Sequence, residues 1–467
     1  MILTPEQLCI VYSDADTIFV EALAGTGKTT TLKEYAKARP CEKILYLVFN
    51  KSVRAESKAK FPKNVEVHTI NSFVYAKMMK LNTNPIMNEL STSFVMRFFR
   101  FQQHEYARAV KIIECCNAFV NSSVPFELFF DSDNTFILDA KKLVSQMYND
   151  TEFPITHGIL LKRFVDEFNF ASLDYDSVLV DEAQDLNGAM FHIINKIPGK
   201  KVYVGDDRQA IYGFRNTINI FRQDIKAERF KLTNSYRFGP VIANFVNTMS
   251  GIMYHKPLGI KGVNEDEIGE IVLDEQENME GLYSAYITRT NAHLFDKAFE
   301  LMKEGKKVSI PFDWDLIKEL LLDVFYLYFN VRERIVTSTI RAYPSFDYMK
   351  KISKAGGDIE LAFLIKVVEK YELELPENII SLHNHLTSPK LADIILLTAH
   401  KAKGLEFFNV EIANDFALIK HAEAEEKNLL YVAMTRVIEK LKPNADLRNT
   451  FLNLSLMSPA GSRVVAI

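Results

Sequence analysis

The chain has 467 residues, more than one ordinary hydrophobic core accommodates, so two to four domains are expected. Hydrophobic residues make up 48% and charged residues 25%, which is typical of a globular protein, and no apolar run reaches the roughly 18 residues that a membrane-spanning helix needs. The formal net charge of −4 excludes a uniformly basic DNA-coating protein, so any nucleic acid must be held by local patches.

The order of the predicted elements indicates two parallel sheets. Short apolar runs rich in β-branched residues alternate with helical patterns, which is the signature of βαβ units. Strands are predicted at 17–23, 43–49, 177–183, 201–207, 271–273, 284–288, 393–399 and 409–415. Mostly helical segments at about 75–170 and 312–386 separate the strands of each half. We therefore expect an α/β protein in which each sheet is interrupted by a helical insertion.

A phosphate-binding loop is predicted at residues 22–29, with the sequence ALAGTGKT. It follows an apolar strand and precedes a helical pattern, which is the context that such a loop requires. Glycines let backbone amides approach a triphosphate, Lys28 can reach the β- and γ-phosphates, and the Thr29 hydroxyl can bind Mg²⁺. The first position of the generic pattern is Ala22 instead of glycine.

The segment VLVDEAQD at residues 178–185 predicts the acidic partner of this loop. A hydrophobic strand ends there in two carboxylates, at the edge of a parallel sheet where open α/β folds bind ligands. Asp181 is expected to hold Mg²⁺, directly or through water, and Glu182 to orient or deprotonate the attacking water. An acidic strand end facing solvent has the same local pattern, but its pairing with a phosphate loop favours a hydrolytic site.

Residues 51–63 form the basic patch with which an acidic chain could hold nucleic acid. The local charge is +5 − 1 = +4, from Lys51, Arg54, Lys58, Lys60 and Lys63 against Glu56. A solvated helix face has the same composition and is the more frequent meaning of such a charge run.

The combination of AGTGKT with DEAQD resembles the UvrD/Rep branch of superfamily 1 helicases. Further segments similar to that family's motifs follow in its order: LTPEQ (3–7), LVFNKS (47–52), TINSF (69–73), VGDDRQAIYGFR (204–215), NSYR (234–237), TRTN (288–291), TAHKAKGLEF (398–407) and EKNLLYVAMTR (426–436). LVFNKS and HKAKGLEF are especially similar to the helicase portion of the F-box DNA helicases. No F-box segment is expected, because the helicase pattern begins at the N-terminus.

The resemblance implies roles at an ATP site. Catalytic roles are implied for Lys28, Asp181, Glu182, Gln209 as γ-phosphate sensor, and Arg237 and Arg436 as arginine fingers. Nucleotide binding is implied for Gln7 at the adenine edge, Tyr236 stacked on the base, Glu406, and the phosphate cradle of Ala24, Gly25, Thr26, Gly27, Lys28, Thr29 and Thr30. ATP and Mg²⁺ are the implied cofactors, with Thr29 and Asp181 at the metal. Arginines suit this chemistry because their planar forks stay protonated and bind phosphate oxygens bidentately.

The resemblance also implies a DNA track. Its residues are Phe49, Asn50, Lys51, Thr69, Ser72, Tyr212, Phe214 and His400. Three positions depart from the family: Phe214 where tryptophan is frequent, Asn71 where histidine is frequent, and Ala433 where glycine is frequent. An aromatic ring at 214 suits sequence-blind stacking on bases, and packing in the core beneath that loop is the alternative.

The implied fold is α/β, with two RecA-like parallel-sheet motor domains of the P-loop NTPase class, each interrupted by a mainly helical accessory insertion. The first motor domain is expected at 1–74 and 166–245, with its insertion at 75–165. The second is expected at 246–304 and 391–467, with a small helical insertion at 305–390.

The implied function is an ATP-dependent DNA helicase and translocase that moves 3′→5′ on single-stranded DNA in replication, recombination or repair. Expected partners are single-stranded DNA and junctions with single-stranded tails, and recombinase or single-strand-binding proteins are further candidate partners. The protein is expected to be a monomer that does not associate with a membrane. The alternative is an ATP-dependent remodeller that strips recombinase or other proteins from DNA with little unwinding. The expected compartment is the cytoplasm for a bacterial or virus-encoded chain and the nucleus for a eukaryotic one.

Overall fold

The computed structural model describes residues 2–78, 83–213, 216–264, 268–281, 283–311, 314–356 and 359–457. The chain divides into two compact units, unit 1 at Met1–Thr233 and unit 2 at Asn234–Ile467. The first motor domain was predicted to extend to residue 245, and this domain boundary stays a prediction beside the division of the chain at Thr233. The segment after Thr233 belongs to unit 2 because it packs there: the Tyr254 hydroxyl donates to Asn428 Oδ1 at 3.0 Å.

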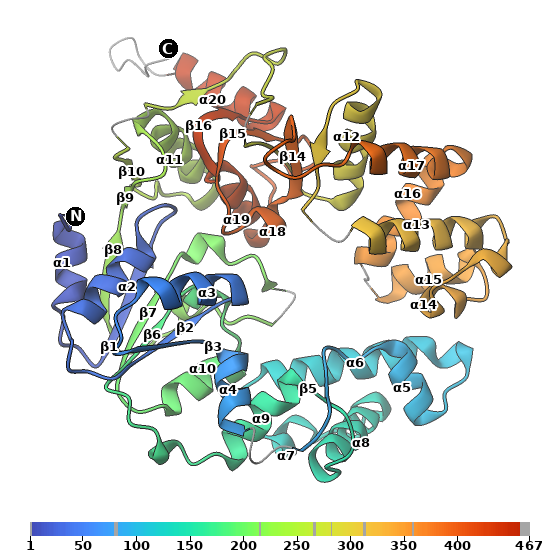
Figure 1. Cartoon of the computed structure of the whole chain (residues 1–467), viewed down its shortest axis with the longest axis horizontal. Helices are drawn as coiled ribbons and strands as arrows, with labels where there is room; N and C mark the ends of the chain where they lie inside the picture. Colours follow the sequence, from blue (N-terminus) through green and yellow to red (C-terminus); the bar gives the residue numbers. More distant parts are fainter. Residues whose placement is uncertain are drawn as a thin grey trace. The chain divides into compact units, whose positions relative to one another are not determined.

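Six parallel strands form the sheet of unit 1, in the order β3-β2-β6-β7-β1-β8 (Figure 1). They are β1 (Thr17–Ala22), β2 (Ile44–Val48), β3 (Val65–Thr69), β6 (Ser177–Val180), β7 (Lys200–Gly205) and β8 (Glu228–Leu232). Every side chain of β2 and β6 is buried, as expected of strands that helices cover on both faces. Because all six strands run the same way, the loops after their carboxyl ends lie along one edge of the sheet.

The two faces of this sheet have separate hydrophobic cores. Ile18 and Val20 of β1 pack with Leu32 and Tyr35 of helix α2, whereas Phe19 belongs to the core on the opposite face. This alternation follows from the two-residue period of a strand. The first face carries α1 (Pro5–Val11), α2 (Lys28–Lys37) and α3 (Lys51–Lys60), and the second carries α4 (Ile70–Met78), α9 (His157–Glu167) and α10 (Gly188–Lys196).

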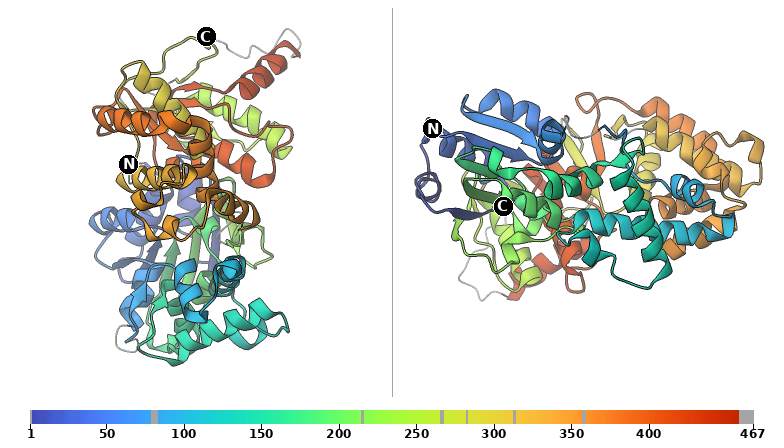
Figure 2. Two further views of the ribbon diagram at one scale, coloured as in Figure 1. Left: turned by 90° about the vertical axis from the view of Figure 1, so that its right-hand side faces the viewer. Right: turned by 90° about the horizontal axis from the view of Figure 1, so that it is seen from below.

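The first insertion is mainly helical, as predicted. Its elements are β4 (Ile86–Met87), α5 (Thr92–Phe99), η1 (Gln103–Glu105), α6 (Tyr106–Asn121), α7 (Phe126–Phe129), α8 (Thr135–Asn149) and β5 (Ile155–Thr156). Helix α6 packs against α5 and α8, in the group drawn cyan to teal in Figures 1 and 2. The Phe-rich segment 94–101 packs on the same core as the sheet, which agrees with its interpretation as packing. Short 3-10 helices follow in the rest of unit 1: η2 (Phe170–Ser172), η3 (Ala183–Asp185), η4 (Asp207–Gln209) and η6 (Ile220–Arg222).

Unit 2 contains a second sheet of six parallel strands, in the order β11-β16-β15-β12-β14-β13. They are β11 (Glu270–Ile271), β12 (Ser284–Thr288), β13 (Val308–Ser309), β14 (Ile394–Thr398), β15 (Phe407–Ile412) and β16 (Val437–Lys442). Two short strands, β9 (Asn234–Ser235) and β10 (Lys261–Gly262), pair separately. The other helices of the sheet region are α11 (Pro240–Tyr254), α12 (Asn291–Lys303), α18 (Ala399–Ala402), α19 (Ala424–Met434) and α20 (Ala445–Met457).

The second insertion is helical as well. It consists of α13 (Trp314–Tyr328), η7 (Arg332–Arg334), α14 (Ser338–Arg341), α15 (Phe346–Gly356), α16 (Ile359–Tyr371), η8 (Glu372–Glu374) and α17 (Leu375–His385). Trp314 stacks on Phe295 of α12 with ring centroids 5.7 Å apart, which gives this single tryptophan a packing role. The predicted class, two parallel sheets each interrupted by helices, is confirmed. Within the described ranges no helix is both long and apolar enough to cross a bilayer.

Candidate functional site

The loop after β1 has the conformation of a phosphate cradle. Gly25 and Gly27 adopt left-handed backbone conformations with φ of 73° and 78°, which glycine tolerates without a side-chain clash. The Thr26 hydroxyl donates to the carbonyl oxygen of Leu23 at 2.8 Å and closes the loop. Helix α2 then begins at Lys28, so that its first backbone amides follow the loop directly. The residues predicted to bind phosphates thus lie in this loop and in the first turn of α2: Ala24, Gly25, Thr26, Gly27, Lys28, Thr29 and Thr30.

Lys28 lies beside the acidic end of β6. Its Nζ is 2.9 Å from Glu182 Oε1, and the two side chains are 15% and 25% exposed. Burial acts to lower the pKa of Lys28, but neighbouring carboxylates outweigh burial and raise it. These carboxylates belong to Glu182, Asp181 and Asp206. The sequence analysis predicts that the phosphate loop and this strand end belong to one site, and in the structure Lys28 and Glu182 are in contact.

Asp181 is held by a tyrosine that the sequence analysis did not identify. The Tyr46 hydroxyl of β2 donates to Asp181 Oδ2 at 2.8 Å, and the Glu182 backbone amide donates to Asp181 Oδ1 at 2.9 Å. Burial, together with the Glu182 charge, raises the pKa of Asp181. Burial also raises the pKa of Tyr46, which keeps its hydroxyl a donor. The available signal was a tyrosine in the middle of the apolar run KILYLVF.

A hydrogen-bonded chain joins Glu182 to Gln209. The Gln184 amide nitrogen donates to Glu182 Oε2, and its oxygen accepts from the Asp206 backbone amide at 3.1 Å. Gln209 Nε2 then donates to Asp206 Oδ2 at 2.8 Å. Gln184 and Asp206 are both fully buried. Neither was singled out in the sequence, although both lie inside the motif segments DEAQD and VGDDRQ.

Gln7 serves the protein's own backbone in this structure. Its Oε1 accepts from the Thr4 backbone amide at 3.0 Å, and its own backbone amide donates to Thr4 Oγ1 at 3.2 Å, which forms a capping box for α1. Gln7 Nε2 donates to Thr31 Oγ1 of α2 at 3.2 Å. These bonds hold α1 beside the phosphate loop, and the implied contact of Gln7 with adenine stays a prediction.

Unit 2 groups the residues of three motif segments around Thr435. Arg237 Nε donates to Glu406 Oε2 at 2.8 Å, and its NH1 donates to the Thr435 carbonyl oxygen at 2.5 Å. Arg436 NH2 donates to Thr435 Oγ1 at 3.2 Å. Tyr236, next to Arg237, is 48% exposed. The structure thus brings the predicted nucleotide residues of unit 2 together, and their roles toward a nucleotide stay predictions.

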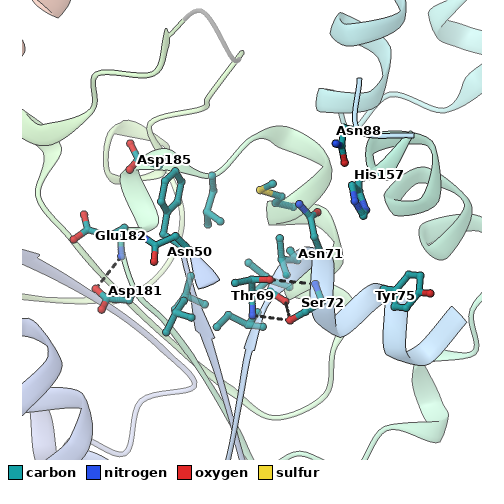
Figure 3. A pocket seen from close by; sticks show the side chains of 18 residues that line it. Asn50, Thr69, Asn71, Ser72, Tyr75, Asn88, His157, Asp181, Glu182 and Asp185 are labelled. Carbon is teal, nitrogen blue, oxygen red and sulfur yellow. Dashed lines mark hydrogen bonds between the residues drawn. The ribbon is translucent and has the colours of Figure 1, made fainter. Parts of the chain in front are cut away.

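A pocket of about 670 Å³ in unit 1 contains four residues of the predicted DNA track (Figure 3). These are Phe49 and Asn50 after β2, Thr69 at the end of β3, and Ser72 in α4. Its lining also includes residues that were not assigned to DNA: Asn71, Tyr75, Asn88, His157, Asp181, Glu182 and Asp185. Thr69 and Ser72 cap each other reciprocally, with Ser72 Oγ accepting from Thr69 N at 2.9 Å and Thr69 Oγ1 from Ser72 N at 3.2 Å.

Two rings of the predicted track stack on each other at this edge of the sheet. The centroids of Phe49 and Tyr212 are 5.7 Å apart with an interplanar angle of 13°. Phe49 is 41% exposed, so one aromatic surface is open to solvent. Lys51 begins α3, and His400 lies on α18 of unit 2. Phe214 lies outside the described residues.

Two family models match this chain. The model of the UvrD/REP helicase N-terminal domain matches residues 41–227, and that of the UvrD-like helicase C-terminal domain matches residues 332–442. The chain belongs to the UvrD-like helicase family. The predicted resemblance to this family is confirmed.

Curated relatives of this UvrD-like chain include two F-box helicases. F-box DNA helicase 1 of Gallus gallus is 28% identical over 96% of this chain and 50% of the relative. F-box DNA helicase protein 1 of Schizosaccharomyces pombe is 28% identical over 94% of this chain and 57% of the relative. The chain thus spans about half the length of these two relatives. Gabija protein GajB of Bacillus cereus is 23% identical, over 92% of this chain and 93% of that protein.

The family matches cover some of the site residues and leave out others. Asp181, Glu182 and Gln209 lie inside the match to the N-terminal UvrD-like domain, whereas the phosphate loop at 22–29 precedes it. Glu406 and Arg436 lie inside the match to the C-terminal domain. The loop is therefore supported by its own conformation and by its contact with Glu182.

Proposed function

We propose that this chain is an ATP-driven helicase that translocates 3′→5′ along single-stranded DNA. The observation that carries the proposal is the position of Glu182. Its carboxylate pairs with Lys28 of the phosphate loop at 2.9 Å, and the same residue lines the pocket that contains Phe49 and Asn50. One side chain thus faces both a phosphate-binding loop and a pocket suited to a nucleotide, an arrangement that would couple ATP hydrolysis to DNA.

Hydrolysis would follow from the contacts around Lys28. ATP would bind with its phosphates at the N-terminus of α2, where backbone amides and the helix dipole attract anions. Lys28 would exchange its contact with Glu182 for phosphate oxygens, which would leave Glu182 to orient the attacking water. Gln209 would respond to the γ-phosphate, because the chain through Gln184 joins it to Glu182.

Positive charge at the transition state has several sources in this proposal. The Asp181 carboxylate and the Thr29 hydroxyl offer the oxygen ligands that Mg²⁺ prefers. In the part of the chain that the structure describes, no three His, Cys, Asp or Glu side chains gather to hold a metal by themselves. Asp181 and Thr29 would hold Mg²⁺, which would supply positive charge to the transferred phosphoryl group. Arg237 and Arg436 would supply further positive charge to the transition state, and each would give up its contact with Thr435.

DNA binding would rest on stacking and on the basic helix that follows. An exposed ring such as Phe49 can stack on any base, which suits a motor that reads no sequence. Helix α3 begins directly after Asn50 and carries Arg54 and Lys58, which would meet backbone phosphates. Single-stranded DNA and junctions with single-stranded tails are the proposed substrates, in replication, recombination or repair. The proposed compartment is the one that holds this DNA, the cytoplasm or the nucleus.

The deciding experiment measures ATP hydrolysis with and without single-stranded DNA, beside unwinding of duplexes with 3′ or 5′ tails. We expect stimulation by single strands and unwinding of the 3′-tailed duplex alone. The Glu182→Gln variant is the control, because it should bind ATP and DNA but fail to unwind. Hydrolysis that ignores DNA would refute the proposal. Stimulation without unwinding, together with displacement of a bound recombinase, would establish the remodeller instead.

A further inference from the structure

The connection between the two units is a single residue long. Thr233 is the last residue of unit 1, and Asn234 is the first residue of unit 2. Strand β8 of unit 1 ends at Leu232, directly before this point. Strand β9 begins at Asn234 and pairs with β10 inside unit 2. The side chain that holds Thr233 therefore sets the point at which the chain leaves unit 1.

That side chain is Glu6 of helix α1. Its Oε2 accepts from the Thr233 backbone amide at 2.9 Å, and its Oε1 accepts from the Thr233 hydroxyl at 2.6 Å. Both hydrogen-bond donors of Thr233 thus bind one carboxylate, and bonds to a charged acceptor are stronger than those between neutral groups. Helix α1 itself lies against β8 and α2 (Figure 1). The position and the orientation of the connecting residue are both fixed from α1.

The phosphate loop is joined at both of its ends to the elements that hold the connecting residue. At its start, the Leu23 backbone amide donates to the Leu232 carbonyl oxygen at the end of β8, at 3.1 Å. At its end, the Thr31 hydroxyl donates to the Gly27 carbonyl oxygen at 3.0 Å and accepts from Gln7 of α1 at 3.2 Å. A change in the loop would therefore reach the connecting residue through β8 and through α1.

The segment after the connecting residue carries Tyr236 and Arg237, which have predicted roles at the nucleotide. Arg237 follows Thr233 by four positions. Inside unit 2, the Val263 backbone amide donates to the Ser235 carbonyl oxygen at 2.9 Å, and Asn264 Nδ2 donates to the Arg237 carbonyl oxygen at 3.3 Å. Because this short segment is hydrogen-bonded along its length, it passes on a displacement of its starting point instead of absorbing it.

We propose that Glu6 is a positioning residue for ATP hydrolysis, which sets Arg237 by holding Thr233. The inference rests on the proposed ATPase and its arginine finger, and it adds a residue that acts without touching the nucleotide. An arginine finger stabilises charge that develops on the transferred phosphoryl group, so its placement matters in the transition state. A misplacement of about 1 Å can cost about 10²-fold in rate. Glu6 therefore acts on kcat and leaves ATP binding unchanged.

The test measures kcat and KM for ATP with the full chain at saturating single-stranded DNA, normalised to the concentration of ATP-binding sites. Glu6→Ala should lower kcat by about tenfold or more and leave KM within about twofold, the pattern of a contribution confined to the transition state. Glu6→Gln should recover most of kcat, because its amide oxygen accepts from the Thr233 backbone and its nitrogen donates to the hydroxyl. Both substitutions remove the same charge from the first turn of α1, so their difference isolates the two bonds.

Two further variants show whether Glu6 acts through the arginine. Glu34→Ala is the matched control, because it removes a carboxylate that pairs with Lys37 at the surface of α2, and it should keep the wild-type kcat. In an Arg237→Ala background, Glu6→Ala should lower the rate by less than about twofold, because the side chain to be positioned is absent. That residual rate is followed by phosphate release in a single turnover.

The outcomes separate this inference from the proposed function. A wild-type chain that does not hydrolyse ATP would refute the proposed function. A slow Arg237→Ala beside a normal Glu6→Ala would refute the positioning role alone. The positioning role would also be refuted by a further tenfold loss in the Arg237→Ala background, or by a loss that disappears after normalisation. A normal kcat of Arg237→Ala would remove the arginine finger and this inference with it.

Discussion

Gln184→Met should slow ATP hydrolysis without weakening ATP binding. Methionine has a similar shape but cannot donate to Glu182 Oε2 or accept from the Asp206 backbone amide, the two bonds that Gln184 makes. A hydrogen bond to a charged group contributes about 1.5–3 kcal/mol. If Glu182 must be held in place only in the transition state, this corresponds to a fall in kcat of about 10- to 150-fold.

The same substitution should lower stability by a separate amount. Gln184 is fully buried, and the Asp206 amide loses its acceptor, which costs about 1–3 kcal/mol. For a unit of this size that predicts a fall in Tm of roughly 2–12 °C. Gly205 belongs to the same packing, because a Cβ at that position would overlap with Gln184 Oε1.

The assay is steady-state phosphate release at saturating single-stranded DNA, normalised to the concentration of ATP-binding sites. Gln223→Met, an exposed glutamine in the same unit, is the matched control and should change neither kcat nor Tm. A positioning role predicts a lower kcat at unchanged KM for ATP. A kcat within twofold of wild type would refute the reasoning, and so would a loss that disappears after normalisation, because it would then report only unfolded protein.

Four further predictions concern the ATP site and the proposed DNA track. Lys28→Ala should abolish phosphate release while circular dichroism shows an intact fold, and near-normal turnover would contradict the nucleotide assignment. Glu182→Gln should retain bound ATP on a filter and hydrolyse it very slowly, whereas loss of ATP binding would make Glu182 a structural residue. Arg237→Ala and Arg436→Ala should each reduce kcat by about 10³-fold or more with a smaller change in ATP affinity, and a normal kcat in either variant would remove that arginine from catalysis. Binding to single-stranded DNA should weaken with salt at a slope of about −0.7 per phosphate contact, and a flat titration would exclude a basic track that includes Lys58.

The elements that carry local signals could be predicted from the sequence. Strands β1, β2, β6 and β7 are apolar runs bounded by polar loops, and each was expected within a few residues of its observed bounds. β3 and β8 were missed because their side chains are only partly buried and mix charged with apolar residues, as in VEVHT and ERFKL. Both strands lie at the edges of the sheet, where one side has no neighbouring strand and burial is weaker.

The sequence pattern does not locate the division of the chain into two units after Thr233. The helix α11 has an apolar pattern that would suit either sheet, and only its contacts assign it to unit 2. Its Phe245 packs against Phe451 of α20 with ring centroids 5.1 Å apart. A pattern of apolar residues indicates that one face of a helix is buried, but it does not indicate which sheet or helix covers that face.

By itself the sequence determined the phosphate loop, the acidic strand end and the family, because glycine positions, a lysine and paired carboxylates at fixed spacing are local requirements of phosphate chemistry. The tertiary structure alone decided which side chains complete the site. Tyr46 reaches Asp181 across 135 residues of chain only because β2 and β6 are neighbours in the sheet. His157 joins Asn71 because α9 and α4 cover the same face. Strand order and helix placement result from packing the whole core at once, and no local pattern specifies them.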